Sequence, residues 1–461
     1  MRRQAPLPRA GAEVTRGRIA VVGGVVALTA ACAALFGGVL SGAPAAVPEG
    51  APEAVSPLAG RLPSIPPARG TAGVVRRLQA RLRAQPEDAG SLTLLGLEYE
   101  QRARETGDPS YYSKADGVLQ RALALAPRSS LSTGGLASLA LSRHRFREAL
   151  ELGREAVRQG SRAAVPAAIQ SRSWGAVGDA LVELGRYPAA FSAFDRVMKL
   201  EPGLAAYARA SYARELLGRP RAALAPMRAA VDESGSEPEP FAWTSVQLGK
   251  LHWSMGQVSR ARREYLRALA AFSGYVYALD ALAQVEAARG SVRRAIALER
   301  RAVSRIPLPQ FVTTLGDLYR RAGRTAAARR EYALIGAIRR LLAANGVKTD
   351  LEVALFQADH RIRLREALRL ARIAQRDRPG IEGDDVLAWT LARNGRCGEA
   401  LRHSRLALRL GTQDALKFFH RGMIERCLGH EAGGRAWLRR SLALNPHFSI
   451  LWAPVARRLA R

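Results

Sequence analysis

Apolar residues recur at helical spacing through most of the chain, from residue 89 to the C-terminus. Gly or Pro interrupts this pattern every dozen residues or so and divides it into segments of ordinary helical length. Almost all of this region is therefore predicted to be α-helical.

A different pattern occupies the first 70 residues. Residues 1–18 carry five Arg against one Glu, and the apolar run 19–40 that follows has no charge. As a helix this run would be about 33 Å long, enough to cross the hydrocarbon core of a bilayer. We expect a basic cytoplasmic N-terminus over 1–18, a transmembrane anchor or signal segment over 19–42, and an extended Pro/Ala-rich linker over 43–70.

The processing of the apolar segment stays open at this point. Its length favours an uncleaved anchor over a secretory signal, but Ala43-Pro44-Ala45 has the form of a cleavage site and Ala30-Ala31-Cys32 resembles the end of a lipobox. Arg residues precede the run and Glu49 and Glu53 follow it, which orients the N-terminus inward. The helical region is therefore expected outside the cytoplasm, membrane-anchored or secreted if the segment is cleaved.

The helical region repeats itself with a period near 34 residues. The repeated core ends on an Ala, and successive Ala residues are 34, 41, 33, 38, 34, 33, 39 and 33 residues apart. The aligned positions are Ala115, Ala149, Ala190, Ala223, Ala261, Ala295, Ala328, Ala367 and Ala400, with Gly434 in the tenth place. Gly precedes most of them at a predicted inter-helix turn, at Gly185, Gly218, Gly256, Gly290, Gly323, Gly395 and Gly429.

This pattern resembles the tetratricopeptide repeat. The best unit reads Trp174-x-x-Val177-Gly178-x-x-Leu181, then Gly185-Arg186-Tyr187-x-x-Ala190, Phe194, Val197 and Pro202. The resemblance covers roughly 360 of the 461 residues. It implies an all-α fold, an α-α superhelix of about ten helix-turn-helix repeats stacked as a solenoid over 71–448, with a capping helix over 449–461.

In this family the concave groove lined by the first helix of each unit binds extended peptides or partner helices. The resemblance therefore implies a non-enzymatic scaffold whose partners are other proteins. Trp and Tyr mixed with a few charges suit peptide recognition. Counting along the units assigns these residues to the groove: Asp179, Tyr212, Trp243, Lys250, Trp253, Tyr277, Asp280, Gln284 and Asp317.

Two cysteines near the C-terminus form a candidate disulfide under the same resemblance. Cys397 would begin the second helix of the ninth unit, and Cys427 would lie near the end of the first helix of the tenth. Stacked units of this family bring those ends to one side of the array, within reach of a disulfide. Such a bond would fit an oxidising, extracytoplasmic location; the alternative is two separate buried thiols.

Charge suggests a second function. The net charge is +31, and Lys supplies only five of the 71 basic residues. An anionic surface, such as membrane headgroups, would attract this protein in a salt-dependent way. A polyanion- or nucleic-acid-binding protein is therefore the alternative, supported by Arg pairs such as Arg262-Arg263, Arg293-Arg294 and Arg329-Arg330. These pairs are spread over the chain instead of forming one stripe, so nucleic acid is not the expected partner.

Motifs of catalysis, cofactor binding or metal binding are missing from the sequence. Of the seven His residues, His420 and His430 lack a third ligand at helical spacing. Asp359 and Asp384-Asp385 are expected to be solvated helix starts, not paired acids. We therefore expect no enzyme activity, no cofactor and no metal site.

Overall fold

The computed structural model describes residues 70–235 and 238–461, and within these ranges the chain forms 22 helices and no strands. The helices are α2 (Thr71–Ala84), α3 (Ala89–Thr106), α4 (Ser110–Leu125), α5 (Ser130–Ser142), α6 (Phe146–Ala163), α7 (Ala167–Glu183), α8 (Tyr187–Leu200), α9 (Leu204–Leu216), α10 (Pro220–Asp232), α11 (Pro238–Ser254), α12 (Val258–Ala271), α13 (Val276–Ala288), α14 (Val292–Arg305), α15 (Pro309–Arg321), α16 (Thr325–Ala344), α17 (Asp350–His360), α18 (Leu364–Asp377), α19 (Ile381–Arg393), α20 (Cys397–Ala407), α21 (Ala415–Cys427), α22 (Glu431–Leu444) and α23 (Ala453–Leu459).

The predicted N-terminus 1–18, the anchor or signal segment 19–42 with Cys32, and nearly all of the linker 43–70 lie outside the described residues. Among the helices that are described, none combines the length and the apolar character that crossing a membrane requires.

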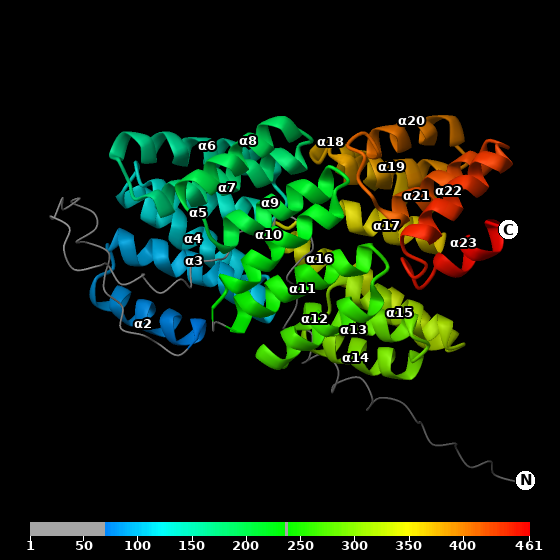
Figure 1. The fold of residues 1–461 in the computed structure, drawn as a ribbon. Helices are drawn as coiled ribbons and strands as arrows, with labels where there is room; N and C mark the ends of the chain where they lie inside the picture. Colours follow the sequence, from blue (N-terminus) through cyan, green and yellow to red (C-terminus); the bar gives the residue numbers. More distant parts are fainter. Residues whose placement is uncertain (1–69, 236–237) are drawn as a thin grey trace, which may run out of the picture.

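Helices α3 to α22 pack as ten successive pairs in chain order (Figure 1). Helix α2 precedes the first pair and α23 follows the last one. The predicted α-α superhelix of about ten repeats is confirmed. Its register is confirmed as well, because each of the nine aligned Ala residues is at most 3% exposed.

The small residues of the repeat explain how closely the two helices of a unit approach. A Cβ atom at Gly249 of α11 would lie 2.3 Å from a ring carbon of Tyr265 of α12. The same holds one pair later, where a Cβ at Gly316 would lie 2.2 Å from the ring of Tyr332. Gly in the first helix therefore makes room for the aromatic residue that follows the aligned Ala in the second, and the two helices share a close-packed core.

The predicted turn glycines all have positive φ, between 69° and 87°. This left-handed conformation suits Gly, since it has no Cβ to clash with the backbone. In the three other units, the residues with positive φ between the two helices include Gly107, His144 and Arg361, with φ of 69°, 57° and 56°.

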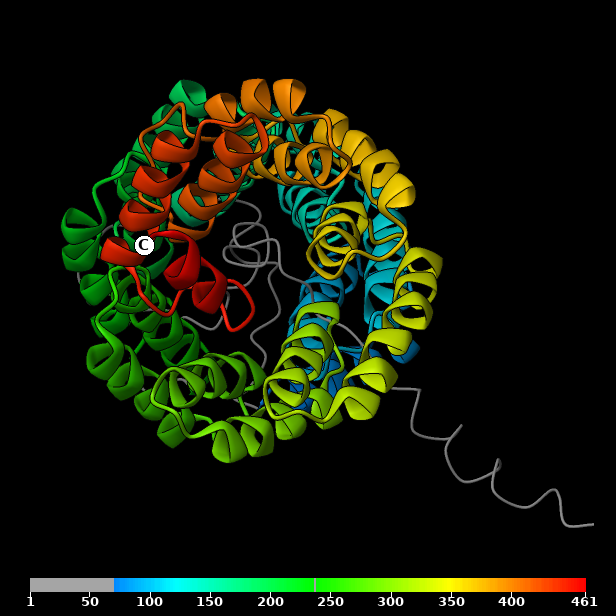
Figure 2. The same cartoon turned by 90° about the vertical axis from the view of Figure 1, so that its right-hand side faces the viewer.

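The second turn of the superhelix packs against the first. Seen in Figure 2, the helices wind around a common axis, and units near the C-terminus return to lie against units roughly 200 residues earlier. We call this line of contacts between successive turns the seam. Its hydrogen bonds run from Lys348 N–H to Arg143 O at 3.2 Å, from Ile381 N–H to Tyr187 Oη at 2.7 Å, from Thr412 Oγ1 to Leu216 O, and from Asn445 Nδ2 to Trp253 O at 2.8 Å.

Turn glycines of the first superhelical turn lie directly against backbone of the second. A Cβ added at Gly218 would lie 2.2 Å from Gly411 O, and one at Gly185 would lie 2.6 Å from Pro379 O. At Gly323, a turn glycine away from the seam, nothing lies within 4 Å. Glycine at the seam positions therefore serves two purposes, since it accepts positive φ and also permits contact between backbones.

Charged and aromatic side chains also cross the seam. Arg378 is buried, forms an ion pair with Glu183 and stacks 5.5 Å from the ring centroid of Phe146. His144 is buried beside it, with Nδ1 2.7 Å from Lys348 O. Burial, followed by the charge of Arg378, lowers the pKa of His144 to about 3, so this imidazole is neutral at physiological pH.

Candidate functional site

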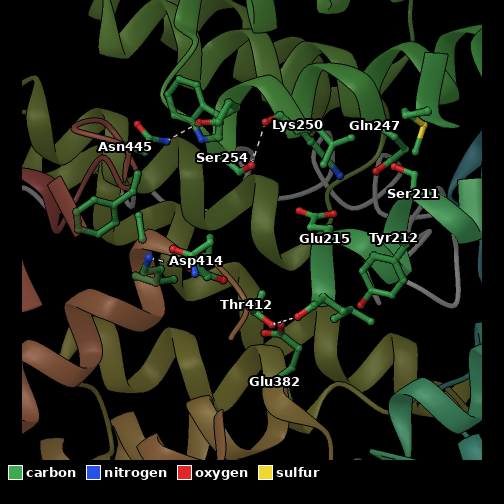
Figure 3. A pocket seen from close by; sticks show the side chains of 18 of the residues that line it. Ser211, Tyr212, Glu215, Gln247, Lys250, Ser254, Glu382, Thr412, Asp414 and Asn445 are labelled. Atoms are coloured by element: carbon green, nitrogen blue, oxygen red, sulfur yellow. Dashed lines mark hydrogen bonds between the residues drawn. The ribbon is translucent and has the colours of Figure 1, made fainter. Parts of the chain in front are cut away.

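A pocket of about 300 Å³ lies on the seam (Figure 3). Helices α9 and α11 of the first turn form one side, and residues around α19, α21 and the C-terminal end of α22 form the other. We call it the seam pocket. Its lining comprises Ala208, Ser211, Tyr212, Glu215, Leu216, Met227, Trp243, Gln247, Lys250, Leu251, Trp253, Ser254, Glu382, Thr412, Gln413, Asp414, Ala415, Leu416, Asn445 and Phe448.

Aromatic side chains from both turns line part of the pocket. Tyr212, Trp243 and Trp253 come from the first turn and Phe448 from the second, and all four are half-buried. Asn445 fixes the two sides at the rim, because its side-chain amide donates to the backbone oxygen of Trp253. The pocket exists in this form only while the seam is closed.

Charged groups of both signs face each other inside the pocket. Figure 3 shows the ammonium of Lys250, which is exposed, and the carboxylate of Glu215 pointing toward one another. Burial, followed by the nearby charge of Asp414, raises the pKa of Glu215 to about 7, while Lys250 opposes that rise. Glu215 is therefore only partly ionised near neutral pH.

A buried lysine fixes the second-turn side of the pocket. The Lys417 ammonium, 4% exposed, donates to Glu382 at 2.7 Å and to Asp414 at 2.8 Å. Asp414 is also the N-cap of α21, where it accepts from the backbone N–H groups of Leu416 and Lys417. Burial alone would raise the pKa of Asp414, but the charge and hydrogen bonds of Lys417 bring it below the ordinary value. Asp414 therefore stays ionised and rigidly placed.

Four of the nine residues assigned to the groove from the sequence meet at this pocket: Tyr212, Trp243, Lys250 and Trp253. Three others lie together on α13. Tyr277 packs edge-on against Phe311 with ring centroids 5.7 Å apart, and Gln284 donates to Asp280 at 3.0 Å. These three are half-buried and lie away from the pocket lining.

The two remaining assigned residues are bonded within the protein. Asp317 accepts hydrogen bonds from Tyr332 at 2.6 Å and His360 at 2.8 Å. Asp179 is 1% exposed and accepts two hydrogen bonds from Arg209, at 3.0 and 2.7 Å. The expectation that Asp179 faces an open groove is therefore wrong, because Arg209 from the next unit reaches back to it and forms a buried ion pair.

Residues of the second turn were missed in the sequence assignment. Glu382, Gln413, Asp414, Asn445 and Phe448 line the pocket but stand some 130 to 240 residues after the first-turn residues they face. No local signal marks them, since their role depends on how far the superhelix rotates before it returns.

The two C-terminal cysteines lie where the repeat register puts them. Cys397 is the first residue of α20 and Cys427 the last of α21. Their Cα atoms are 5.9 Å apart, within the range of a disulfide, and the structure joins them by one.

The acidic residues expected at solvated helix starts are internal instead. Asp384 and Asp385 are 3% and 5% exposed, and they pair with Arg409 at 2.6 Å and with His420 at 3.0 Å. Asp359 accepts from the indoles of two tryptophans, each at 2.8 Å. The expectation of solvated acids is wrong, because neighbouring units cover these positions. Residues 70–235 and 238–461 contain no cluster of three or more potential metal ligands.

The tetratricopeptide repeat family model matches residues 246–308, which cover the second half of α11 and all of α12, α13 and α14. No curated protein matches the chain. Among solved structures, the APC/C hetero-tetramer Cut9-Hcn1 is similar at 13% identity with a TM-score of 0.35, covering 85% of this chain and 93% of that one.

Two further solved structures are similar over shorter ranges. A tetratricopeptide repeat protein from Parabacteroides merdae shares 15% identity over 56% of this chain and 97% of that one, with a TM-score of 0.31. PilW, a type IV pilus biogenesis factor, shares 17% identity over 54% of this chain and 92% of that one, with a TM-score of 0.30. Likenesses this distant carry no information about function.

Proposed function

We propose that this chain, which is a tetratricopeptide-repeat protein, is a non-enzymatic scaffold of the cell envelope that holds a partner peptide or helix at the seam pocket. Proteins of this family typically mediate protein–protein interactions. The observation that carries the proposal is the convergence of Tyr212, Trp243, Lys250 and Trp253 with second-turn residues around one pocket.

The chemistry of the pocket supports a polypeptide as the ligand. Aromatic faces offer contact to an apolar side chain, and hot spots of protein interfaces are rich in such residues. Gln247, Gln413, Lys250 and Glu215 supply donors and acceptors for the backbone and polar groups of a bound segment. A pocket with this mixture suits a peptide, which presents all of these groups together.

The same lining opposes a polyanion. Three carboxylates, those of Glu215, Glu382 and Asp414, face the pocket, and two of them are bonded to Lys417. A phosphate chain entering here would meet these carboxylates in a site partly shielded from water, where like charges repel strongly. Nucleic acid is therefore disfavoured at this site.

A photo-crosslinking experiment tests the proposal. The full chain, produced in its own cells, would carry p-benzoylphenylalanine in place of Tyr212, or of Leu334 as a control that is 45% exposed on α16. We expect a polypeptide adduct at position 212 that is absent at 334. Trp253→Ala in the same chain should abolish it, since the backbone bond to Asn445 remains while the aromatic wall is lost. Equal adducts at both positions, or adducts that nuclease removes, would refute the proposal.

The envelope location is a separate part of the proposal, supported by the sequence of residues 1–42. Protease would be added to intact cells or spheroplasts that express the full chain with a C-terminal tag. Loss of the tag, with the N-terminal segment retained in the membrane fraction, is the expected result. A protected tag would mean that the repeats face the cytoplasm and would end this part of the proposal.

A further inference from the structure

A second hollow, of about 410 Å³, lies between α10 and α12 over the flank of α11. We call it the arginine hollow. Its lining comprises Arg228, Val231 and Asp232 of α10, Leu248 and His252 of α11, and Arg260, Arg263, Glu264 and Arg267 of α12. It shares no residue with the seam pocket.

The arginines converge because of helical spacing. Arg260, Arg263 and Arg267 stand at positions i, i+3 and i+7 of α12, so they lie on one face of that helix. Arg228 reaches the hollow from α10, on the opposite side. All four side chains are exposed, so a dissolved anion can reach them from solvent.

Carboxylates balance only part of this charge. Glu264 pairs with Arg267 at 2.7 Å, and Arg260 donates to the uncharged Gln257 at 3.2 Å. Arg228 and Arg263 have no carboxylate within 4.0 Å in the part of the chain that the structure describes. With four arginines against Asp232 and Glu264, the hollow has a net charge of about +2.

The buried histidine in the hollow responds to the same charges. His252 is 4% exposed, and its Nδ1 lies 2.7 Å from Oε1 of Gln257. Burial lowers the pKa of His252, and Arg260 and Arg228 lower it further, against opposing effects of Gln257 and Glu264. The ring is therefore neutral at physiological pH, and the positive charge of the hollow comes from its arginines.

We propose that the arginine hollow binds a phosphate monoester or inorganic phosphate, at a site separate from the seam pocket. A guanidinium presents parallel N–H donors that match two phosphate oxygens, and arginines from opposite sides can engage different oxygens of one tetrahedral group. A dianion would also neutralise the excess charge. Other exposed arginine pairs, such as Arg293 and Arg294 of α14, lie outside this lining.

The test compares two double variants of the full chain with equal loss of charge. Arg228→Gln/Arg263→Gln removes the two unbalanced arginines of the hollow, and Arg293→Gln/Arg294→Gln is the control. Binding of inorganic phosphate would be measured by calorimetry at low ionic strength. Loss of charge-assisted hydrogen bonds should weaken binding about 10-fold or more in the hollow variant and less than about twofold in the control.

A second arm identifies the source of the phosphate. Flotation with phosphatidic acid vesicles, whose headgroup is a phosphate monoester, would be compared with phosphatidylglycerol vesicles of equal surface charge. Hollow-dependent binding to phosphatidic acid alone would assign the site to a lipid headgroup, and hollow-dependent binding of free phosphate would assign it to a soluble ligand. If neither probe distinguishes the hollow variant from the control, only general charge attraction is at work and the proposal is overturned.

Discussion

Replacing Gly218 by Ala tests the closure of the superhelix, and Gly323→Ala is its matched control. Both glycines occupy the same turn of a repeat, with φ of 71° and 73°. Placing Ala in this left-handed conformation costs about 1–2 kcal/mol, and the lower entropy of the unfolded chain offsets about 0.4–1 kcal/mol of that. The conformational cost alone is therefore about 1 kcal/mol in either variant.

The seam adds a second cost at Gly218 only. The new Cβ would lie 2.2 Å from Gly411 O, a backbone atom that cannot rotate away. Overpacking of this kind costs about 1–3 kcal/mol, and moving the 411–412 backbone would also break the hydrogen bond from Thr412 to Leu216 O, worth about 1 kcal/mol. We expect Gly218→Ala to be more destabilising than Gly323→Ala by about 2–4 kcal/mol.

Urea unfolding followed by circular dichroism and tryptophan fluorescence would measure this difference. Both variants carry the same Gly-to-Ala substitution, so they differ only in the atoms that surround the substituted turn. Equal midpoints for the two variants would refute the reasoning, because they would show that no backbone lies against Gly218 in solution.

Three other features of the fold give predictions. Burial raises the pKa of Glu100 from 4.5 to about 7, so the stabilisation from its protonated form is present below about pH 4.5 and is lost as the pH rises through 7. Between about pH 5 and pH 8, the free energy of unfolding of Glu100→Gln should therefore rise by on the order of 2–3 kcal/mol relative to that of the unaltered protein. The same pH profile of stability in both proteins would contradict this. Cys397 and Cys427 should resist alkylation until reduced, and reduction should cost about 3 kcal/mol for this loop of about 30 residues; mass spectrometry showing both thiols labelled without reductant would disprove the bond. Asp179→Ala should cost about 3–5 kcal/mol in thermal or urea unfolding, because Arg209 would be left buried without its carboxylate; a loss below about 1 kcal/mol would argue against the buried pair.

The repeat architecture was predictable because its determinants are local. The aligned Ala, the turn Gly and the aromatic residue after each Ala all act within one helix pair or between adjacent pairs. Ala190 and Gly185, for example, have the burial and the positive φ that the repeat pattern requires. The part of the site that lies on one helix, such as Lys250 and Trp253 of α11, could be found by the same counting.

The rest of the site depends on distances that no single repeat encodes. A small rotation per repeat accumulates over several units, and only its sum decides which unit returns to face α11. The contact of Trp253 with Asn445, 192 residues later, follows from that sum. Asp179 shows a different limit, since the periodicity assigns it to the inner surface but Arg209 in the following unit buries it.

The seam pocket exists only if the seam is closed, because residues of both turns form it. Ile381 is the first residue of α19, where a backbone N–H has no partner within its own helix. It donates instead to Tyr187 Oη, 194 residues earlier. Hydrogen exchange at the Ile381 amide should be slow in the unaltered protein and at least about 10-fold faster in Tyr187→Phe, with the Asp384 amide, bonded to Gly380 O, as the internal control. Exchange of Ile381 at the rate of an unprotected amide in the unaltered protein would show that the two turns do not meet.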